Sequence, residues 1–304
     1  MKNINRRKFI KSGLILGGVT WLGAQMPFKL SAFANPEEIP DIVSIAAGNP
    51  LLSMEKLLAP LGGIKSFVPQ GSTVGILVNS PWKNPGYYTD PDVALGVIKL
   101  CLDAGAKKIV CFKPVPNDYW TRGKYHSEMT TAISEIIYGS ERIKVPVNGK
   151  SLKEAEIFKI FKEVDVYISI PVAKHHNGCL YSGNLKGLMG VSSSATNRSM
   201  HSPDSQYTYD NHTWLAQCIA DLNLLRKPDL CVIDATICAT TNGPAGPGET
   251  VSPGLIIAGK DPVATDAYSA RLIGFEAEEV LTLTKAAEHK LGTDDLTGLL
   301  IKQL

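Results

Sequence analysis

The sequence predicts a single α/β domain in which helices cover both faces of a layered, mostly parallel sheet. Three observations lead to this fold class. Short apolar segments alternate with helical segments throughout residues 35–304. The segments at residues 73–79 and 164–171 are mainly apolar, as expected of strands that are buried on both faces. Residues 73–112 read as a complete strand–helix–strand unit, which is expected to be right-handed and parallel.

In the first half of the domain, strands are expected at residues 41–47, 73–79, 108–112 and 143–147. Helices are expected at about residues 53–61, 89–104, 127–138 and 152–161. Ser53 is the expected N-cap of the first helix. Pro91 suits the first turn of the second helix, and Gly105 ends it.

In the second half, strands are expected at residues 164–171, 230–235 and 255–259, and helices at 212–225, 262–273 and 277–291. Residues 172–211 show no clear periodicity. Irregular stretches of this length are uncommon in compact domains and are often functional.

The first 34 residues are expected to be a cleaved export signal of the twin-arginine type. Residues 5–11 (NRRKFIK) carry the arginine pair, and an apolar run follows at residues 13–21. This run is shorter than the roughly 20 residues that span a bilayer. Cleavage is expected after Ala34, so the partners would be the twin-arginine translocase and signal peptidase, and the destination the periplasm or cell envelope. An ordinary secretory signal or an uncleaved anchor is the alternative.

Net charge argues against nucleic-acid binding. The first 34 residues hold six basic and no acidic residues, which leaves 25 basic and 29 acidic residues and a net charge of −4 in the remainder. Binding to phosphate backbones needs clustered Lys and Arg, and no such cluster occurs here. No stretch of the mature part is long and apolar enough to predict a membrane span.

The six cysteines include no C-x-x-C pair, so an iron–sulfur cluster or zinc ribbon is not expected. Disulfides are allowed in an exported protein. Buried free thiols are favoured because several cysteines lie in apolar strand and helix patterns.

Candidate site residues follow the predicted strands, because ligands of open α/β sheets bind beyond the carboxyl ends of the strands. Asn79 is the last residue of one predicted strand. Lys174, His176, Lys186 and His201 follow another. Three interpretations of these last four residues remain open. His176 and His201 could be metal ligands. The lysines could hold an anionic substrate while a histidine carries protons. All four could also be unrelated exposed residues.

The predicted strand at residues 230–235 contains Asp234 near its carboxyl end, and a Gly/Pro loop follows at residues 242–248. Backbone N–H groups of Asn242 and Gly243 could hold an anion, or the loop could simply form turns. Asp234 and Asp266 could line the same pocket or satisfy local backbone groups. The sequence has no P-loop, dinucleotide-binding glycine pattern or G-x-S-x-G motif.

From residue 71 to about residue 274 the chain resembles the family catalogued as domain of unknown function 362. The resemblance rests on three blocks in a fixed order. The first block is residues 74–110, with Asn79. The second contains Ile170-Pro171, Lys174-x-His176, Leu185-Lys186, Met189-Gly190 and His201. The third is residues 228–267, with Asp234, Asn242-Gly243-Pro244 and the segment GKDPVATDA that contains Asp266. Two residues depart from the pattern: Leu77 stands where Lys is expected and Gly187 where Asn is expected. These departures indicate either an altered ligand preference or a site that is only partly kept.

The order of Lys174, His176, Lys186 and His201 is also similar to the catalytic segment of the lactate racemase family. Members of that family hold a nickel–pincer nucleotide and use histidines as acid and base. The resemblance implies that the four residues share one pocket, with a transition metal or a metal-containing cofactor as the implied group.

Two functions follow. The first is an exported metal- or cofactor-dependent enzyme acting on a small anionic substrate, with Lys174 and Lys186 holding negative charge and the histidines binding metal or moving protons. The alternative is a non-catalytic protein that holds a metal or cofactor for a partner. The two functions differ in turnover, because an enzyme converts its substrate whereas a carrier binds and releases its ligand unchanged.

Overall fold

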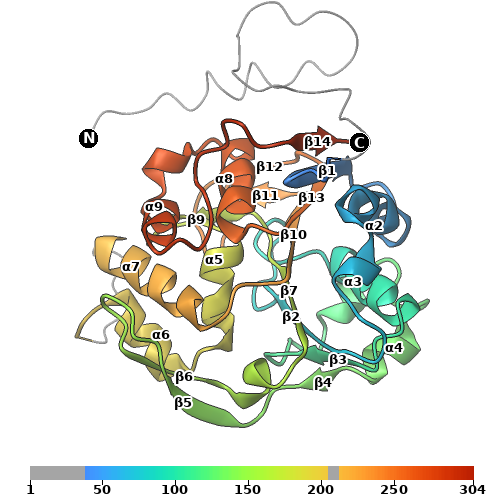
Figure 1. The fold of residues 1–304 in the computed structure, drawn as a ribbon, viewed down its shortest axis with the longest axis horizontal. Coiled ribbons are helices and arrows are strands. Elements are labelled where there is room, and N and C mark those ends of the chain that lie inside the picture. The colour runs from blue at the N-terminus through green and yellow to red at the C-terminus, as the bar shows by residue number, and fades with distance from the viewer. Residues whose placement is uncertain (1–37, 205–211) are drawn as a thin grey trace, which may run out of the picture.

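The computed structural model describes residues 38–204 and 212–304, so the expected export signal lies outside the described residues. The main strands are β1 (Ile42–Ala46), β2 (Thr73–Val78), β3 (Lys108–Cys111), β4 (Ile137–Tyr138), β7 (Val166–Ile170), β10 (Leu230–Ala235), β13 (Leu255–Gly259) and β14 (Ile301–Gln303). They form one eight-stranded sheet with the order β14–β1–β13–β10–β7–β2–β3–β4 (Figure 1). The predicted single α/β domain is confirmed.

The sheet is mostly parallel, as predicted, and β13 is the exception. All neighbouring pairs are parallel except that β13 runs antiparallel to both β1 and β10. The chain passes from β10 to β13 through the short strands β11 (Cys238–Ala239) and β12 (Thr250–Val251) without a helix. A parallel return needs a long crossover, usually helical, so this connection brings β13 back in the opposite direction.

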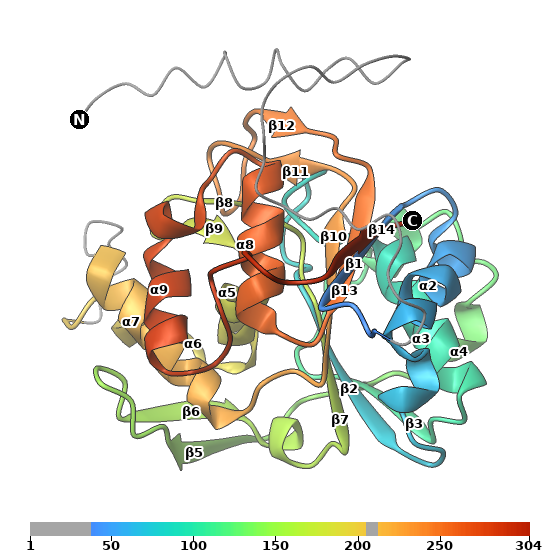
Figure 2. The ribbon, with the colours of Figure 1, turned by 45° about the horizontal axis from the view of Figure 1, so that its top comes forward.

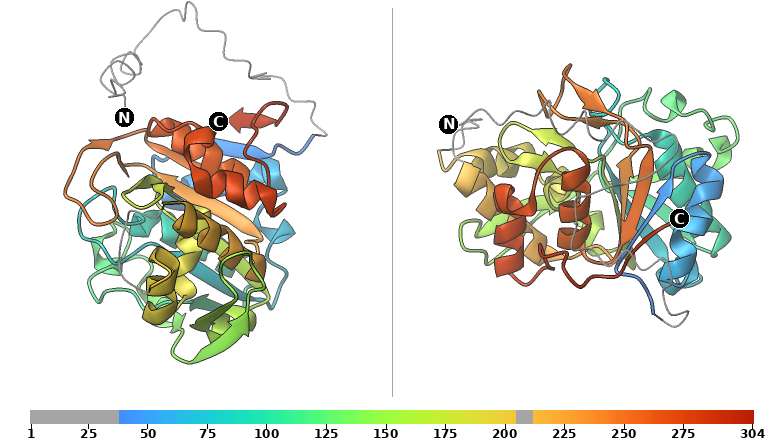
Figure 3. Two further views of the ribbon diagram at one scale, coloured as in Figure 1. Left: turned by 90° about the vertical axis from the view of Figure 1, so that its left-hand side faces the viewer. Right: turned by 90° about the horizontal axis from the view of Figure 1, so that it is seen from above.

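Helices cover both faces of the sheet (Figures 2 and 3). The helices α2 (Pro50–Leu58), α3 (Pro91–Asp103) and α4 (Thr130–Ser134) lie on one face, and α5 (Asn184–Gly187), α7 (His212–Leu222), α8 (Pro262–Leu272) and α9 (Leu281–Glu288) lie on the other. In β2, Val74 and Ile76 face the first layer, while Leu77 faces the second. This alternation follows from the two-residue period of a strand and gives the domain two cores.

The start of α3 illustrates how local sequence sets an element. Asp90 is the N-cap and its side chain accepts a hydrogen bond from the backbone N–H of Asp92. Pro91 occupies the first turn, and Gly105 follows the helix with φ +89°, as the sequence predicts.

Several predicted elements were wrong. Residues 152–161 do not form a helix; β6 (Glu154–Phe158) pairs there with β5 (Arg142–Pro146) as an antiparallel hairpin. Alternate residues of β6, Ala155 and Ile157, are buried. This two-residue period of burial favours a strand despite the helix propensity of the segment. Ser53 is not the N-cap of α2, because Asn49 caps it and Ser53 lies inside it.

Other differences concern helix length. The helix expected at residues 127–138 is reduced to the short α4, and the one expected at 277–291 is split into a 3₁₀ turn, Ala277–Glu279, and α9. The stretch 172–204 is more regular than expected. It contains the hairpin of β8 (Lys174–His176) and β9 (Leu180–Ser182), then α5 and α6 (Ser194–His201).

The six cysteines are buried free thiols, as favoured from the sequence. Within residues 38–204 and 212–304, no helix combines the length and apolar character needed to cross a bilayer.

The carboxylate of Asp266, on α8, fixes the start of α5. Its Oδ1 accepts hydrogen bonds from the backbone N–H of Asn184 at 2.7 Å and from Asn184 Nδ2 at 3.0 Å. Its Oδ2 accepts the Leu185 N–H at 3.0 Å. Since α5 is only four residues long and carries Lys186, its position depends on this buried anchor. Burial raises the pKa of Asp266 to about 7.

Gly243 allows the loop after β11 to pack against β8. Its backbone N–H donates to His175 Nδ1 at 3.1 Å, and a Cβ at this position would overlap the His175 carbonyl oxygen. Beside it, Asn242 adopts a left-handed φ of +54° and its Nδ2 donates to the Pro247 carbonyl oxygen at 2.9 Å.

We expect Gly243→Ala to lower the free energy of unfolding by about 1–3 kcal/mol, because the loop must move away from β8. Gly187→Ala is the matched control: a Cβ there meets only Pro171 Cβ at 3.8 Å, and α5 gains helix propensity. Urea denaturation of both variants measures the difference. An equal loss in both would contradict this account of the loop.

Asp266→Asn is expected to change how stability depends on pH. With a folded-state pKa of about 7 and an unfolded value of about 4, the folded state binds more protons between these pH values. The contribution of Asp266 to the free energy of unfolding therefore falls as pH rises from about 4 to about 7. Denaturation at several pH values should show the wild-type free energy decreasing relative to that of Asp266→Asn across this window. A constant difference would contradict the expectation.

Candidate functional site

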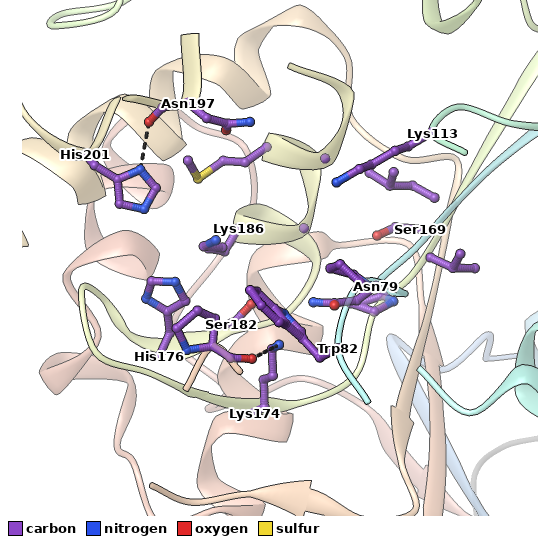
Figure 4. A pocket seen from close by; sticks show the side chains of 18 residues that line it. Asn79, Trp82, Lys113, Ser169, Lys174, His176, Ser182, Lys186, Asn197 and His201 are labelled. Atoms are coloured by element: carbon purple, nitrogen blue, oxygen red, sulfur yellow. Dashed lines mark hydrogen bonds between the residues drawn. The ribbon is translucent and has the colours of Figure 1, made fainter. Parts of the chain in front are cut away.

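A cavity of about 330 Å³ opens at the carboxyl ends of β2 and β7 (Figure 4). Five predicted site residues line it: Asn79, Lys174, His176, Lys186 and His201. They come from the end of β2, from β8, and from α5 and α6. The structure thus brings together residues that are up to 122 positions apart in the sequence.

Other polar and aromatic residues of the cavity did not stand out in the sequence. They are Trp82, Lys113, Ser169, Ser182 and Asn197. Lys113 closely follows β3, so the rule that ligands bind beyond strand ends could have found it. Ser182 and Asn197 lie in the stretch without periodicity, where no comparable signal exists.

Four of the candidate site residues do not line this cavity: Asp234, Asn242, Gly243 and Asp266. Asp234 Oδ2 accepts the Asp90 N–H at 2.7 Å, and its Oδ1 accepts the N–H and hydroxyl of Thr236. Asp234 therefore fixes the start of α3. Burial raises the pKa of Asp234 to about 6.

Lys174 is 1% exposed, and its ammonium group is held by backbone carbonyls. Nζ donates to the Tyr87 carbonyl oxygen at 2.8 Å and to the Pro244 carbonyl oxygen at 2.9 Å. It also lies 5.7 Å from the centre of the Trp82 ring. Two of its three N–H donors are thus committed, and Lys174 links β8 to the loops that follow β2 and β11.

His176 and His201 lie next to each other, with ring centres 6.4 Å apart and ring planes inclined by 38°. The two imidazoles have different backbone partners. His176 Nδ1 accepts a hydrogen bond from the Gly178 N–H at 3.0 Å. His201 Nδ1 lies 2.7 Å from the Asn197 carbonyl oxygen.

The cavity collects positive charge. Among the residues that the structure describes, Lys113, Lys174, Lys186 and two histidines line it, and no aspartate or glutamate does. Burial lowers the pKa of Lys174 well below its ordinary value, and the nearby Lys186 lowers it further. Burial also lowers the pKa of Lys186. A bound anion would supply the charge that these groups lack.

The pKa values of the two histidines are lowered as well. For His176 the causes are burial, then the charges of Lys186 and Lys174, and the pKa lies well below its ordinary value. For His201 burial again dominates, while the hydrogen bond to the Asn197 carbonyl acts in the opposite direction. Both imidazoles are therefore favoured as neutral groups at neutral pH.

A metal ion held jointly by His176 and His201 does not fit this arrangement. Outside the undescribed residues 1–37 and 205–211, no three His, Cys, Asp or Glu side chains are grouped to hold a metal. The Gly178 N–H occupies His176 Nδ1, so a neutral His176 carries its proton on Nε2 and has no lone pair there for a metal. Of these two histidines, only His201 has the Nδ1–carbonyl arrangement typical of metal-ligating imidazoles.

An anionic organic ligand fits better. Besides the cations, the buried amide oxygens of Asn79 and Asn197 have no hydrogen-bond partner within the described part of the chain. Buried polar atoms are normally paired, so these oxygens indicate that a ligand with hydroxyl or N–H donors can enter. Leu77, Met189 and Pro171 supply apolar surface between the polar groups.

The chain is similar to known proteins in sequence and in structure. A thylakoid-associated protein from Synechocystis sp. is 26% identical over 256 residues, which cover 82% of this chain and 77% of that protein. Among solved structures, the lactate racemase apoprotein from Thermoanaerobacterium thermosaccharolyticum has a TM-score of 0.49 at 13% identity and covers 82% of this chain. A Thermotoga maritima protein has a TM-score of 0.45 at 12% identity and covers 79% of the chain.

This chain spans about three fifths of the length of both solved structures, with 59% and 60% of those chains covered. The family model described as a domain of unknown function, DUF362, matches residues 74–271, which include β2 from Val74 onward, the hairpin of β8 and β9, and all five predicted residues of the cavity. The chain therefore belongs to the DUF362 family.

Proposed function

We propose that this chain is an enzyme that binds a small organic anion in the cavity and moves a proton on it. The observation that carries the proposal is the charge of the cavity: lysines and histidines line it, and no carboxylate from the described residues balances them. Burying cations without a partner is costly, so a site of this kind gains free energy when an anion enters.

The side chains support different roles in this proposal. Lys186 is partly exposed and no backbone carbonyl holds its Nζ among the contacts of the described chain, so it is the cation best placed to bind the anionic group. Lys174 shapes the site, because two of its three N–H donors are committed to Tyr87 and Pro244. His176 and His201 supply proton donors and acceptors beside the ligand.

Lys186→Met is expected to weaken anion binding at least roughly tenfold, because it removes a charge-assisted hydrogen bond from a buried site. Isothermal titration with pyruvate and with inorganic phosphate measures the affinity. The matched control is Lys144→Met, whose side chain is 72% exposed on β5, and it should bind as the wild type does.

Two outcomes would count against the proposal. If the wild type binds neither probe, or if Lys144→Met loses as much affinity as Lys186→Met, the cavity is not the anion site. Stoichiometric binding without conversion of any anion tested would instead favour the alternative of a non-catalytic carrier.

We also propose that the chain is exported through the twin-arginine pathway to the periplasm or cell envelope, where signal peptidase cleaves it after Ala34. The proposal rests on the pattern of residues 5–11 and on the apolar run that follows. A relative that is described as thylakoid-associated is consistent with a membrane-bounded destination.

Replacing both Arg6 and Arg7 by Lys should block export while keeping the charge of the signal, because the translocase recognises the arginine pair. Fractionation of cells that express the full chain measures this. The single replacement of Lys2 by Gln, outside the motif, should still be exported. Equal export of the double variant and the wild type would contradict the proposed route.

A further inference from the structure

We infer that the backbone holds His176 and His201 in opposite tautomers, so that His176 donates a hydrogen bond to the ligand and His201 is the single base of the site. The inference rests on the proposed function and makes it more specific. It rests on the hydrogen bonds of two ring nitrogens and on the charge that surrounds them.

The partner of His176 fixes its tautomer. The Gly178 N–H points at Nδ1 from 3.0 Å, and a backbone N–H can only donate. Nδ1 must therefore carry the lone pair, and the proton of the neutral ring must be on Nε2. In a doubly protonated His176, the Nδ1–H would face the Gly178 N–H, which is also a donor. This would be costly because the residue is only 1% exposed.

The partner of His201 fixes the opposite tautomer. Its Nδ1 lies 2.7 Å from the carbonyl oxygen of Asn197, one turn earlier in α6, and a carbonyl oxygen can only accept. Nδ1 must therefore carry the proton, and the lone pair of the neutral ring is on Nε2. Protonation of Nε2 keeps the bond to Asn197, so His201 can become a cation without losing its partner.

The two rings therefore complement a polar ligand of one orientation. Both rings line the same cavity and their centres are 6.4 Å apart, so one ligand in the cavity can contact both. It must offer an acceptor to His176 and an acidic hydrogen to His201. An anionic carbonyl compound with a hydrogen on the carbon next to the carbonyl meets both requirements, and its anionic group can reach Lys186.

The corresponding step is a proton transfer with one base. His201 Nε2 takes the proton from the carbon, and the electron pair of the broken C–H bond moves towards the carbonyl oxygen. The oxygen, now an enolate, accepts the hydrogen bond from His176 Nε2–H. The His201 imidazolium then returns the proton to carbon or to oxygen. Atoms and electrons balance without an added oxidant or reductant. A mechanism with two histidine bases would require His176 to gain a proton at the expense of its bond to Gly178.

The deciding measurement is a long-range ¹H–¹⁵N correlation spectrum of the wild-type protein with labelled histidines, at about pH 8 so that the imidazoles are neutral. His176→Gln and His201→Gln spectra assign the two signals. We expect His176 to show a protonated Nε2 and His201 a protonated Nδ1. The same tautomer in both rings, or a protonated Nδ1 in His176, would overturn the inference. The spectrum needs no ligand, so it is informative even if the proposed anion binding fails.

Binding of pyruvate, which accepts hydrogen bonds at its carbonyl and carboxylate, gives a second readout. Loss of the donor in His176→Leu should weaken binding roughly tenfold more than loss of the base in His201→Leu. His176→Gln keeps an N–H group near the position of Nε2 and should recover part of the affinity. Equal losses in the two leucine variants would overturn the division of roles, whereas no pyruvate binding by the wild type would count against the proposed function.

Discussion

The site depends first on the buried ammonium group of Lys174. An ammonium ion removed from water must be surrounded by acceptors, and here the acceptors are the carbonyl oxygens of Tyr87 and Pro244. Because these residues belong to loops that follow different strands, one side chain from β8 draws three distant segments to the same edge of the sheet. Gly243 makes this possible by letting its loop lie directly on β8.

The remaining charges of the cavity are organised differently. Lys174 is satisfied by the protein itself, whereas Lys186 and Lys113 bring charge to a cavity that lacks carboxylates from the described residues. The buried carboxylates Asp234 and Asp266 lie nearby but are committed to backbone N–H groups at the starts of α3 and α5. The acidic groups thus build the framework, while the cations are available to a ligand. This separation explains why an anion is the expected partner.

The histidine pair shows how backbone geometry decides chemistry that residue identity leaves open. His176 and His201 are the same residue type in the same cavity, yet one faces a backbone donor and the other a backbone acceptor. The difference assigns them unlike protonation patterns and makes joint metal ligation a poor fit. The neighbouring lysines also favour a neutral His176, because their charges disfavour a positive charge on its ring and so lower its pKa.

The sequence by itself determined the α/β class, most strands of the sheet and the family, because buried strands and capped helices leave local patterns: the apolar run of β2 and the start of α3 at Pro91 are examples. It also marked Asn79, Lys174, His176, Lys186 and His201. Only the tertiary structure decided that these five residues share a cavity. It also decided that Asp234 and Asp266 accept hydrogen bonds from backbone N–H groups at the starts of helices, and that residues 154–158 form a strand. The physical reason is that loop convergence, strand pairing and histidine tautomers depend on contacts between distant segments, which no local pattern encodes.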